Sequence, residues 1–508
     1  MKILRIFSIG VLIAMLILSV LFTASCQSNE APVQNDLNDS NASNEAAPEQ
    51  NDVTGEDPDY IELLSSEYDF NGYEFKVMVP EGEAHMSDSG PAIYASEELI
   101  GEVVNDAIFN RNKKIESALN IVINVFVHAP GSIIETYHAV ARDVKAGDRS
   151  FDIAIPHIIQ NVDAMAAEGL LADWNHIASV DFTQPWWNKA AMDSFSMAKR
   201  NFFAVSEFNF GNYGNTYAMF FNKDFLQEYN LENPYDLVRE KKWTVDKILE
   251  MTKDIYQDLN GNGTVDPEDL FGYSGSNTGV LLGFMYASEI VLFKTDDEGV
   301  PYIAFINEKT NNLINKITGL YYEDNRSYIY GNTEINIFKA MEENRMFLQA
   351  DKISEIIKLR GAEIDFGILP YPLYDENQER YRTYVDAWGG VLCIPSNIYD
   401  DELDKIGVIV DALSYETMVN LKPAYYEIAL KGKYARDEES GEMLDILYGG
   451  LIYDLSYAFN RGAHHNHLIF PSNVNERRGS RFVSSMERIE PAIQSYLDDM
   501  HERISNLD

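Results

Sequence analysis

Phe151-Asp152-Ile153-Ala154-Ile155 is a short, almost wholly apolar run, and it decides the fold class of the 508-residue chain. Such a run is typical of a strand in a parallel sheet that is covered on both faces. Two further strands are predicted at Tyr73–Val79, where apolar residues alternate, and at Ile121–Val127. Apolar residues at helical spacing occupy 97–119, 133–146 and 158–168. This order predicts a doubly wound α/β lobe whose ligand crevice lies at the carboxyl ends of the strands.

The second half of the chain has a similar alternation and predicts a second lobe. A strand at 217–221 and a helix at 243–256 begin it. Further strands are expected at 346–348, 366–369 and 390–394, and a C-terminal helix at 486–504. At about 100–200 residues per domain, the length of the chain agrees with two or three domains or lobes.

The charge balance excludes some classes of partner. The chain has 40 Lys and Arg residues against 81 Asp and Glu residues, so its formal net charge is −41. Phosphate binding needs basic patches, so nucleic acid is not an expected partner. Residues 60–508 hold 38 basic and 72 acidic residues, and this body alone carries −34. The charge weakly favours a neutral ligand over an anionic one.

The first 25 residues have the pattern of an export signal. Lys2 and Arg5 precede an apolar run from Phe7 to Phe22, and Thr23-Ala24-Ser25-Cys26 follows. The segment resembles a bacterial lipoprotein signal, although Thr23 stands where that family prefers Leu. The resemblance implies that Cys26 becomes the first residue after cleavage and carries acyl chains such as palmitate. The alternative is an uncleaved membrane anchor, and both leave the body outside the cytoplasmic membrane.

Residues 26–59 are predicted to be the lipidated Cys26 followed by a tether. Residues 27–59 contain nine acidic residues, no Lys or Arg and few large apolar side chains. Such a segment cannot bury enough surface to fold, so it is expected to be a disordered spacer.

The second cysteine, Cys393, stands in the apolar run Val391–Pro395 and is expected to be a buried thiol. Two cysteines exclude a disulfide scaffold.

Several short motifs resemble those of one protein family when they are taken in order. They are Phe151–His157, Gly169-Leu170-Leu171-Ala172-Asp173, Phe220–Phe225, Lys242–Asp246, Gln184-Pro185-Trp186-Trp187-Asn188 and Lys433–Asp437. Together they resemble the family 1 extracellular solute-binding lipoproteins of bacterial carbohydrate ABC importers, the group that includes maltose-binding protein. The last two motifs are similar to a Gram-positive branch. The resemblance covers most of 70–415.

The resemblance implies an α/β, two-lobed type II fold of the periplasmic binding proteins, with hinge crossovers and a ligand cleft. It assigns 60–205 plus 344–400 to the N-terminal lobe and 206–343 plus 401–508 to the C-terminal lobe. It also implies a monomer that is lipid-anchored at the extracellular face and is not an enzyme. Such a protein has no catalytic cofactor and delivers a sugar or oligosaccharide to permease subunits, while other subunits hydrolyse ATP.

Sugar recognition needs flat aromatic rings together with hydrogen-bond donors and acceptors. His157 follows the third strand and is expected at the mouth of the crevice. The runs 208–216 and 384–390 combine aromatic, amide and glycine residues where the chain should cross between lobes. Trp186 and Trp187 are adjacent, so in an extended segment at most one of them faces the cleft. The ligand-binding candidates are Trp388, Asp386, Tyr213, Asn215, His157, Trp187, Trp186 and Phe208. For each, the alternative is a packed aromatic residue or a turn amide.

The loop 258–269 has the spacing of a calcium-binding loop. Gly263 stands at position 6, where such a loop turns sharply. The predicted ligands are the side chains of Asp258, Asn260, Asn262, Asp266 and Asp269 and the carbonyl of Thr264. Asn at positions 3 and 5, and Asp269 instead of Glu, predict modest affinity for a structural calcium ion. The alternative is a metal-free turn rich in Asn and Asp.

Other chemistries have less support. His464-His465-Asn466-His467 is expected to be a polar loop, because its spacing does not place the three rings on one helical face. The predicted function is therefore a membrane-anchored extracellular protein that captures a sugar for an ABC importer. The alternatives are a surface glycan hydrolase or lyase, which needs only two suitably spaced carboxylates, and a structural or sensor lipoprotein without a transport role.

Overall fold

The computed structural model describes residues 59–80, 93–95, 100–128, 135–330, 337–359, 362–426, 437–460 and 466–507. The predicted signal 1–25, Cys26 and the tether through residue 58 lie outside the described residues, as do 433–436 and His464-His465. No helix in the described part of the chain combines the length and the apolar character that crossing a membrane requires.

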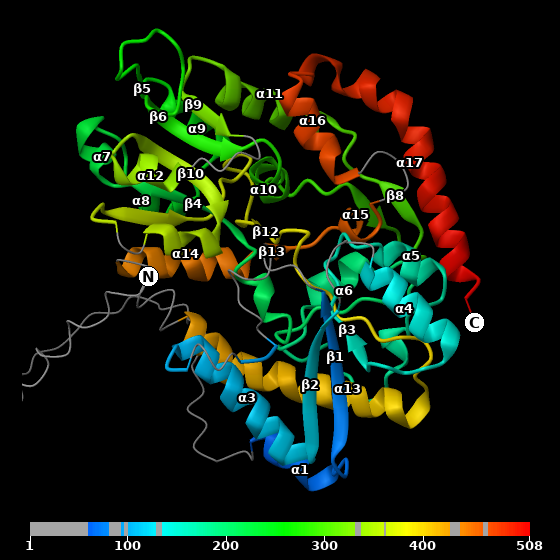
Figure 1. Cartoon of the computed structure of the whole chain (residues 1–508). Helices are drawn as coiled ribbons and strands as arrows, with labels where there is room; N and C mark the ends of the chain where they lie inside the picture. The colour runs from blue at the N-terminus through cyan, green and yellow to red at the C-terminus, as the bar shows by residue number, and fades with distance from the viewer. Residues whose placement is uncertain are drawn as a thin grey trace, which may run out of the picture. The chain divides into compact units, whose positions relative to one another are not determined.

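The first sheet has three parallel strands in the order β2-β1-β3 (Figure 1). β1 (Tyr73–Pro80) and β2 (Ile121–His128) lie where the apolar alternation predicts them. β3 is only Ile153–Ala154, because just two residues of the predicted strand pair with β1. The helices of this region are α3 (Val103–Leu119), α4 (Glu135–Ala146) and α5 (Val162–Ala167). The predicted strand–helix alternation is confirmed here.

The second sheet is mixed, with six strands in the order β11-β4-β10-β6-β5 and with β9 also paired to β6. β10 runs antiparallel to β4 and parallel to β6. The strands are β4 (Tyr217–Asn222), β5 (Tyr256–Gln257), β6 (Leu270–Ser276), β9 (Ser327–Tyr330), β10 (Met346–Lys352) and β11 (Phe366–Leu369). The predicted strands 217–221, 346–348 and 366–369 all belong to this sheet.

β4 is buried along its whole length because both faces of the second sheet are covered. Tyr217, Met219 and Phe221 belong to one apolar cluster, whereas Ala218 and Phe220 belong to another. Alternate residues of a strand point to opposite faces, so β4 contributes to two cores at once. This explains why its sequence is apolar rather than alternating.

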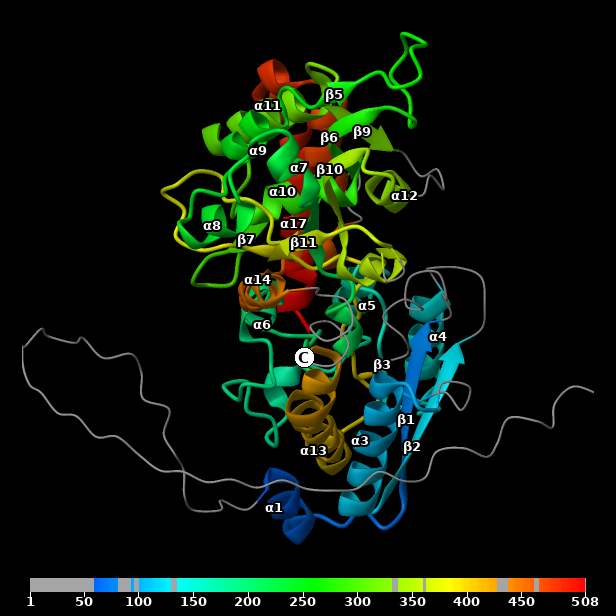
Figure 2. The same cartoon turned by 90° about the vertical axis from the view of Figure 1, so that its left-hand side faces the viewer.

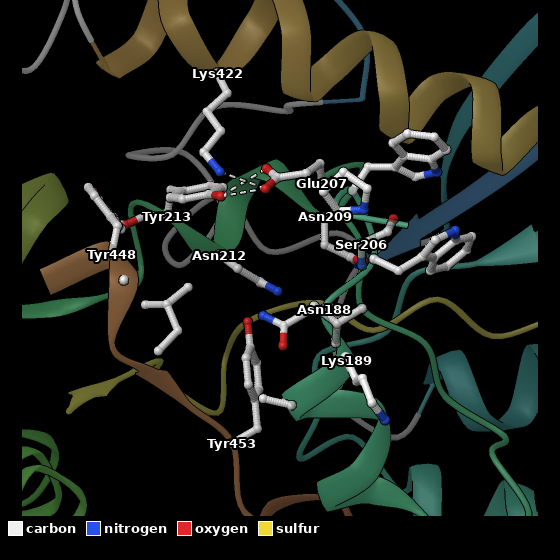
Figure 3. Close-up of a pocket in the computed structure, with 17 residues that line it drawn as sticks. Asn188, Lys189, Ser206, Glu207, Asn209, Asn212, Tyr213, Lys422, Tyr448 and Tyr453 are labelled. Carbon is white, nitrogen blue, oxygen red and sulfur yellow. Dashed lines mark hydrogen bonds and ion pairs between the residues drawn. The ribbon is translucent and has the colours of Figure 1, made fainter. Parts of the chain in front are cut away.

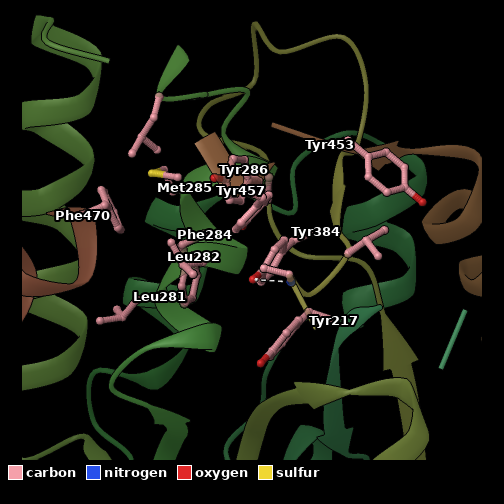
Figure 4. Packing of buried hydrophobic residues seen from close by; sticks show 14 of the residues in the cluster. Tyr217, Leu281, Leu282, Phe284, Met285, Tyr286, Tyr384, Tyr453, Tyr457 and Phe470 are labelled. Atoms are coloured by element: carbon pink, nitrogen blue, oxygen red, sulfur yellow. Dashed lines mark hydrogen bonds between the residues drawn. The ribbon is translucent and has the colours of Figure 1, made fainter. Parts of the chain in front are cut away.

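Four stacked tyrosines join separate elements next to β4 (Figure 4). The Tyr217 ring lies 5.0 Å from the Tyr384 ring, measured between centroids. The rings of Tyr286 and Tyr457 stack on Tyr384 at 5.2 Å and 5.6 Å. The cluster therefore connects β4 with α10 (Gly279–Ala287), β12 (Thr383–Tyr384) and α15 (Leu455–Ala458).

Two segments pack differently from the predicted division into lobes. β10 and β11 fall in the segment 344–400, which was assigned with the first lobe, but they pair with β4 of the second sheet. Conversely, α13 (Asp400–Glu416) packs against α1 (Tyr60–Glu67) and α3 (Figures 1 and 2). The reason is that sheet pairing and helix packing join segments far apart in sequence. The lobe boundaries themselves stay a prediction.

Several predicted elements have different bounds, and three of them lie in the second half of the chain. The helix expected at 243–256 is α9 (Val245–Thr252), because Tyr256 instead pairs with β6 as part of β5. Residues 390–394 form isolated bridges, such as Cys393 with Ala154, and not a continuous strand. The C-terminal helix α17 spans Phe482–Ser505. The other elements are α6 (Lys189–Phe195), α7 (Asp224–Glu228), α8 (Pro234–Arg239), β7 (Phe293–Thr295), β8 (Pro301–Ile303), α11 (Glu308–Tyr322), α12 (Ile337–Glu342), α14 (Glu438–Gly449), β13 (Leu451–Ile452) and α16 (Ile469–Asn475).

Candidate functional site

A pocket of about 270 Å³ is assembled from four segments that are distant in sequence (Figure 3). Residues 185–190 form one wall and lead into α6. Residues 205–213 cross the floor, and Lys422 reaches in from the end of the long helix that begins with α13. Residues 448–453, which run from the end of α14 through β13, complete the lining.

The wall of the pocket is a turn held against the neighbouring segment. The Trp187 amide donates to the Gln184 carbonyl at 3.1 Å, which closes a four-residue turn with Pro185 at its second position. Asn188 then caps α6 by accepting from the Ala191 amide at 2.9 Å. The Glu207 amide donates to the Trp186 carbonyl at 2.8 Å, so the wall and the floor share backbone hydrogen bonds.

The polar centre of the pocket is the carboxylate of Glu207. The Tyr213 hydroxyl lies 2.8 Å from each of its two oxygens, and the Lys422 ammonium donates to Oε1 at 2.7 Å (Figure 3). Lys422 also lies over the Tyr213 ring, 5.1 Å from its centroid. Burial, followed by the charge of Glu207, raises the pKa of the Tyr213 phenol well above its usual value. Tyr213 therefore remains a neutral donor at neutral pH.

Aromatic and amide side chains surround this centre. The Tyr448 ring lies 5.0 Å from the Tyr213 ring, and its hydroxyl donates to the Tyr213 carbonyl at 3.3 Å. Asn212 is fixed by Gly390, whose amide donates to Oδ1 at 2.9 Å while Nδ2 donates to the Gly390 carbonyl. The lining thus offers ring faces, amide groups and one ion pair, which is the chemistry that recognises polyhydroxylated molecules.

Four of the predicted residues gather at a second place, where the segments 215–216 and 385–390 meet. Asp386 donates its amide to the Asn215 carbonyl at 2.9 Å, and Asp386 Oδ2 lies 3.4 Å from the Lys352 ammonium. The His157 imidazole Nδ1 is hydrogen-bonded to the Trp388 carbonyl, and the two rings meet edge to face at 5.3 Å. Asp386, Asn215 and His157 are buried, whereas Trp388 is half-buried.

The pocket and this second group together contain seven of the eight predicted side chains. Trp186, Trp187 and Tyr213 line the pocket. Phe208 lies in neither place: it is 1% exposed and packs beneath Arg111, whose guanidinium carbon is 5.3 Å from the ring centroid. Its side chain is part of the core.

The segment that carries Trp186 and Trp187 is not extended, so the alternation expected of an extended segment does not apply. Both indole N–H groups donate to the same oxygen of Asp411, Oδ1, at 2.7 Å. Residues 184–187 form a turn and not an extended strand, so neighbouring side chains need not alternate between two faces. Both rings are less than 10% exposed and belong to the core of the first sheet.

The pocket residues that the sequence did not predict include Glu207, Lys422, Tyr448 and Tyr453. Glu207 directly precedes the aromatic and amide run 208–216, so an acid at its start was the available signal. Lys422, Tyr448 and Tyr453 come from segments that reach the pocket through tertiary packing alone. No local pattern marks them.

The predicted calcium loop connects β5 to β6 as a hairpin, so a strand and not a helix leads into it. The Asp258 carboxylate accepts from the amides of Gly261 and Gly263 at 2.7 Å and 2.8 Å. The Asn260 and Asn262 side chains both donate to Asp266 Oδ2. Among the described residues, no three His, Cys, Asp or Glu side chains are grouped to hold a metal by themselves. A cation here would also need the amide and carbonyl oxygens of the loop.

No family model matches the chain, and no curated protein matches it. Solved structures do resemble it, among them three with a TM-score of 0.50. A family 1 extracellular solute-binding protein from Bifidobacterium longum subsp. infantis is 13% identical, over 86% of this chain and 100% of that one. The apo form of RafE from Streptococcus pneumoniae is 12% identical, over 85% and 98%. UgpB from Mycobacterium tuberculosis, in complex with glycerophosphocholine, is 15% identical, over 84% and 98%. The chain therefore has the two-lobed α/β fold of the type II solute-binding proteins.

Proposed function

We propose that this chain is an extracellular solute-binding protein that captures a sugar or oligosaccharide and delivers it to the permease of an ABC importer. The observation that carries the proposal is the lining of the pocket. Tyr213 and Tyr448 supply ring faces, while Glu207 and Lys422 supply an acceptor and a donor for hydroxyl groups. The fold supports the same conclusion, because it is the fold of proteins that bind solutes between two lobes.

Binding without turnover is the favoured mode of action. A glycoside hydrolase acts with two carboxyl groups that flank the scissile bond. Among the described lining residues Glu207 is the one carboxylate, so this lining does not supply the pair of carboxyl groups that such an enzyme needs. A hydrolase or lyase is therefore the less favoured candidate for this pocket.

The proposed protein stays at the outer face of the membrane through acyl chains on Cys26. The lipoprotein-like signal before Cys26 and the polar, acidic segment that follows it support this anchor. A tether of this composition keeps a body of net charge −34 away from an anionic lipid surface.

We also propose that the β5–β6 hairpin loop holds a structural calcium ion. The loop gathers carboxylate, amide and carbonyl oxygens, which are the ligands that calcium prefers. Asp266 and Asp258 would supply the charge, and Gly263 adopts a positive φ of 72° at the sharp turn. The role of the ion would be to stiffen the hairpin, because a single loop without a paired partner is a poor switch.

A glycan panel tests the main proposal when binding and turnover are followed together. The protein is mixed with maltotetraose, cycloalternan, tagatose and other neutral sugars, and both its melting temperature and the products are measured. We expect stabilisation by at least one sugar, which is recovered unchanged. Product formation without stabilisation would contradict the proposal and favour the hydrolase.

A further inference from the structure

Asp411, in the middle of α13, holds three aromatic side chains at once. Its Oδ1 accepts from the indole N–H groups of Trp186 and Trp187, each at 2.7 Å. Its Oδ2 accepts from the hydroxyl of Tyr60, in α1, at 2.6 Å. The Asp411 residue is 3% exposed, so these contacts take place inside the core of the first sheet and away from solvent.

All three partners of Asp411 are neutral donors. Within the described residues no Lys, Arg or His forms an ion pair with this carboxylate. A buried charge without a counter-ion persists only where hydrogen bonds replace its water. Burial raises the pKa of Asp411, while the bonds from Trp186, Tyr60 and Trp187 oppose that rise. An apolar side chain would fill this space without burying a charge, so packing alone does not account for a carboxylate at position 411.

The ring contacts around Asp411 strengthen the same arrangement. The Tyr60 ring lies 5.0 Å from the Trp186 ring, and Tyr415, one turn further along α13, lies 5.2 Å from Trp186. Trp187 packs on Trp174 at 5.6 Å and on Phe182 at 5.1 Å. Neither indole can leave Asp411 without disturbing these contacts, so both are fixed in position and orientation.

The turn that carries the two tryptophans is the wall of the pocket. The Trp186 carbonyl accepts from the Glu207 amide at 2.8 Å, and Trp187 forms a bridge with Ser206. The Asn188 amide donates to the Val205 carbonyl at 2.9 Å. The position of the Glu207 backbone, and with it the centre of the pocket, therefore depends on a turn whose two side chains are held by Asp411.

We propose that Asp411 is a positioning residue for sugar binding, acting through Trp186 and Trp187 on the pocket wall. This inference rests on the proposed function, because it assigns to the pocket the role of the sugar site. It also gives a role to α1, the helix that follows the tether, since Tyr60 holds the second oxygen of the same carboxylate. Asp411 does not touch the ligand.

Substitutions at Asp411 separate positioning from packing. D411L removes the acceptor and leaves both indole N–H groups without a partner. In D411N the amide oxygen still accepts from both indoles, while its N–H₂ group donates to the Tyr60 oxygen. D401N is the matched control, because Asp401 is an exposed residue of the same helix. Y60F is a milder variant that deletes a single hydroxyl and serves if D411L does not fold.

Two measurements are made on the full-length variants. The first is amide hydrogen exchange over 184–189 and 205–207 without sugar. We expect exchange to accelerate at least tenfold in D411L and about threefold in Y60F, and to stay at the wild-type rate in D411N and D401N. The second is the affinity for the panel sugar that stabilises the wild type most, with maltotetraose as the first probe. We expect D411L to bind at least tenfold more weakly and D411N within threefold of wild type.

The outcomes distinguish this inference from the proposed function. Unchanged exchange in both D411L and Y60F overturns the positioning role, whatever the affinities are. Faster exchange in D411L with wild-type affinity also overturns it, because the wall would then move without consequence for binding. A wild-type protein that binds no sugar contradicts the proposed function and, with it, a role in sugar binding. The exchange data then still decide whether Asp411 holds the turn.

Discussion

The phenol of Tyr213 lies within 2.8 Å of both carboxylate oxygens of Glu207. Tyr213 stays protonated, so it can only donate to this carboxylate. Lys422, at the end of the long helix that begins with α13, is a second donor to it. Glu207 is thereby held in one orientation with its charge balanced. A ligand hydroxyl that enters the pocket meets an acceptor that is already in place, which lowers the entropic cost of binding.

Replacement of this carboxylate tests its role directly. Hydrogen bonds to charged groups contribute about 1.5–3 kcal/mol, so Glu207→Gln should weaken binding of the best panel sugar by about tenfold or more. Titration calorimetry measures the affinity. Glu487→Gln, at an exposed position of α17, is the matched control. Wild-type affinity in Glu207→Gln would remove this residue from the site.

In the second group, Trp388 is half-buried, whereas the other three predicted ligand residues are buried. If it stacks on a sugar ring, Trp388→Ala should reduce affinity by about tenfold, since aromatic contacts contribute about 1 kcal/mol beyond the area that they bury. Tyr399→Ala controls for loss of an exposed aromatic ring, because Tyr399 is 58% exposed and lies outside both groups. An unaltered dissociation constant in Trp388→Ala would show that the second group is not part of the sugar site.

Asp351, at the end of β10, should make stability depend on pH. Burial, with a further contribution from Glu355, raises its pKa from 3.8 to about 6, although Lys352 and Tyr330 oppose the shift. Between these two values the folded state binds a proton that the unfolded chain has lost, so this contribution to stability falls as pH rises. Asp351→Asn should therefore gain about 1–3 kcal/mol relative to wild type between pH 4 and pH 7, after allowance for partial exposure. Denaturant unfolding of both proteins at pH 4 and at pH 7 measures this difference in stability.

A constant stability difference between Asp351→Asn and wild type across this range would contradict that prediction. Asp401→Asn is the control here as well, since it removes an exposed carboxylate and should give no such trend. Other groups titrate in the same range, and comparison with wild type at each pH removes their contribution.

Calcium should raise the melting temperature if the hairpin loop binds it. A ligand at one hundred times its dissociation constant stabilises the folded state by about 2.7 kcal/mol. We expect a rise of a few degrees in calcium relative to a chelator, and its loss in Asp266→Asn, which removes a carboxylate at the centre of the loop. Asp296→Asn, in another exposed turn, should keep the calcium response. Equal melting temperatures with calcium and chelator would falsify the site.

The proposed anchor predicts a change of location. Cys26→Ala removes the sulfur that would carry the lipid, so the protein should move from the membrane fraction to the medium, or remain as a precursor with its leader attached. Cell fractionation and the mass of the mature N-terminus measure both results. A wild-type N-terminus without acyl groups would exclude the anchor, and an intact leader would favour the membrane-spanning alternative.

The sequence predicted the strands well wherever local pattern determines them. β1, β2, β4 and β11 lie within one residue of their predicted bounds, because their apolar residues have no other place to be buried. Sheet pairing was less visible. β3 pairs with β1 over only two residues. α9 ends at Thr252 because Tyr256, four residues later, belongs to β5 and pairs with β6.

The candidate site could be predicted only in part, for a physical reason. The runs that include Tyr213 and Trp388 are local, and their mixture of aromatic and polar residues is visible in the sequence. Lys422 and Tyr448 reach the pocket of Tyr213 from segments more than two hundred residues away from it, through packing that no local pattern encodes. The turn at Trp186 does have a local signal, because Pro at the second position favours a turn over an extended strand.

The burial of Cys393 has a practical consequence. Its side chain is 0% exposed and burial raises the pKa of its thiol, so it does not react with reagents that attack thiolates. Expressed without residues 1–26, the protein offers no accessible sulfhydryl from this position, and a cysteine introduced at Tyr399 would be labelled selectively. A fluorophore attached there would give the proposed capture of a sugar an optical test, since its emission should change if binding alters its surroundings.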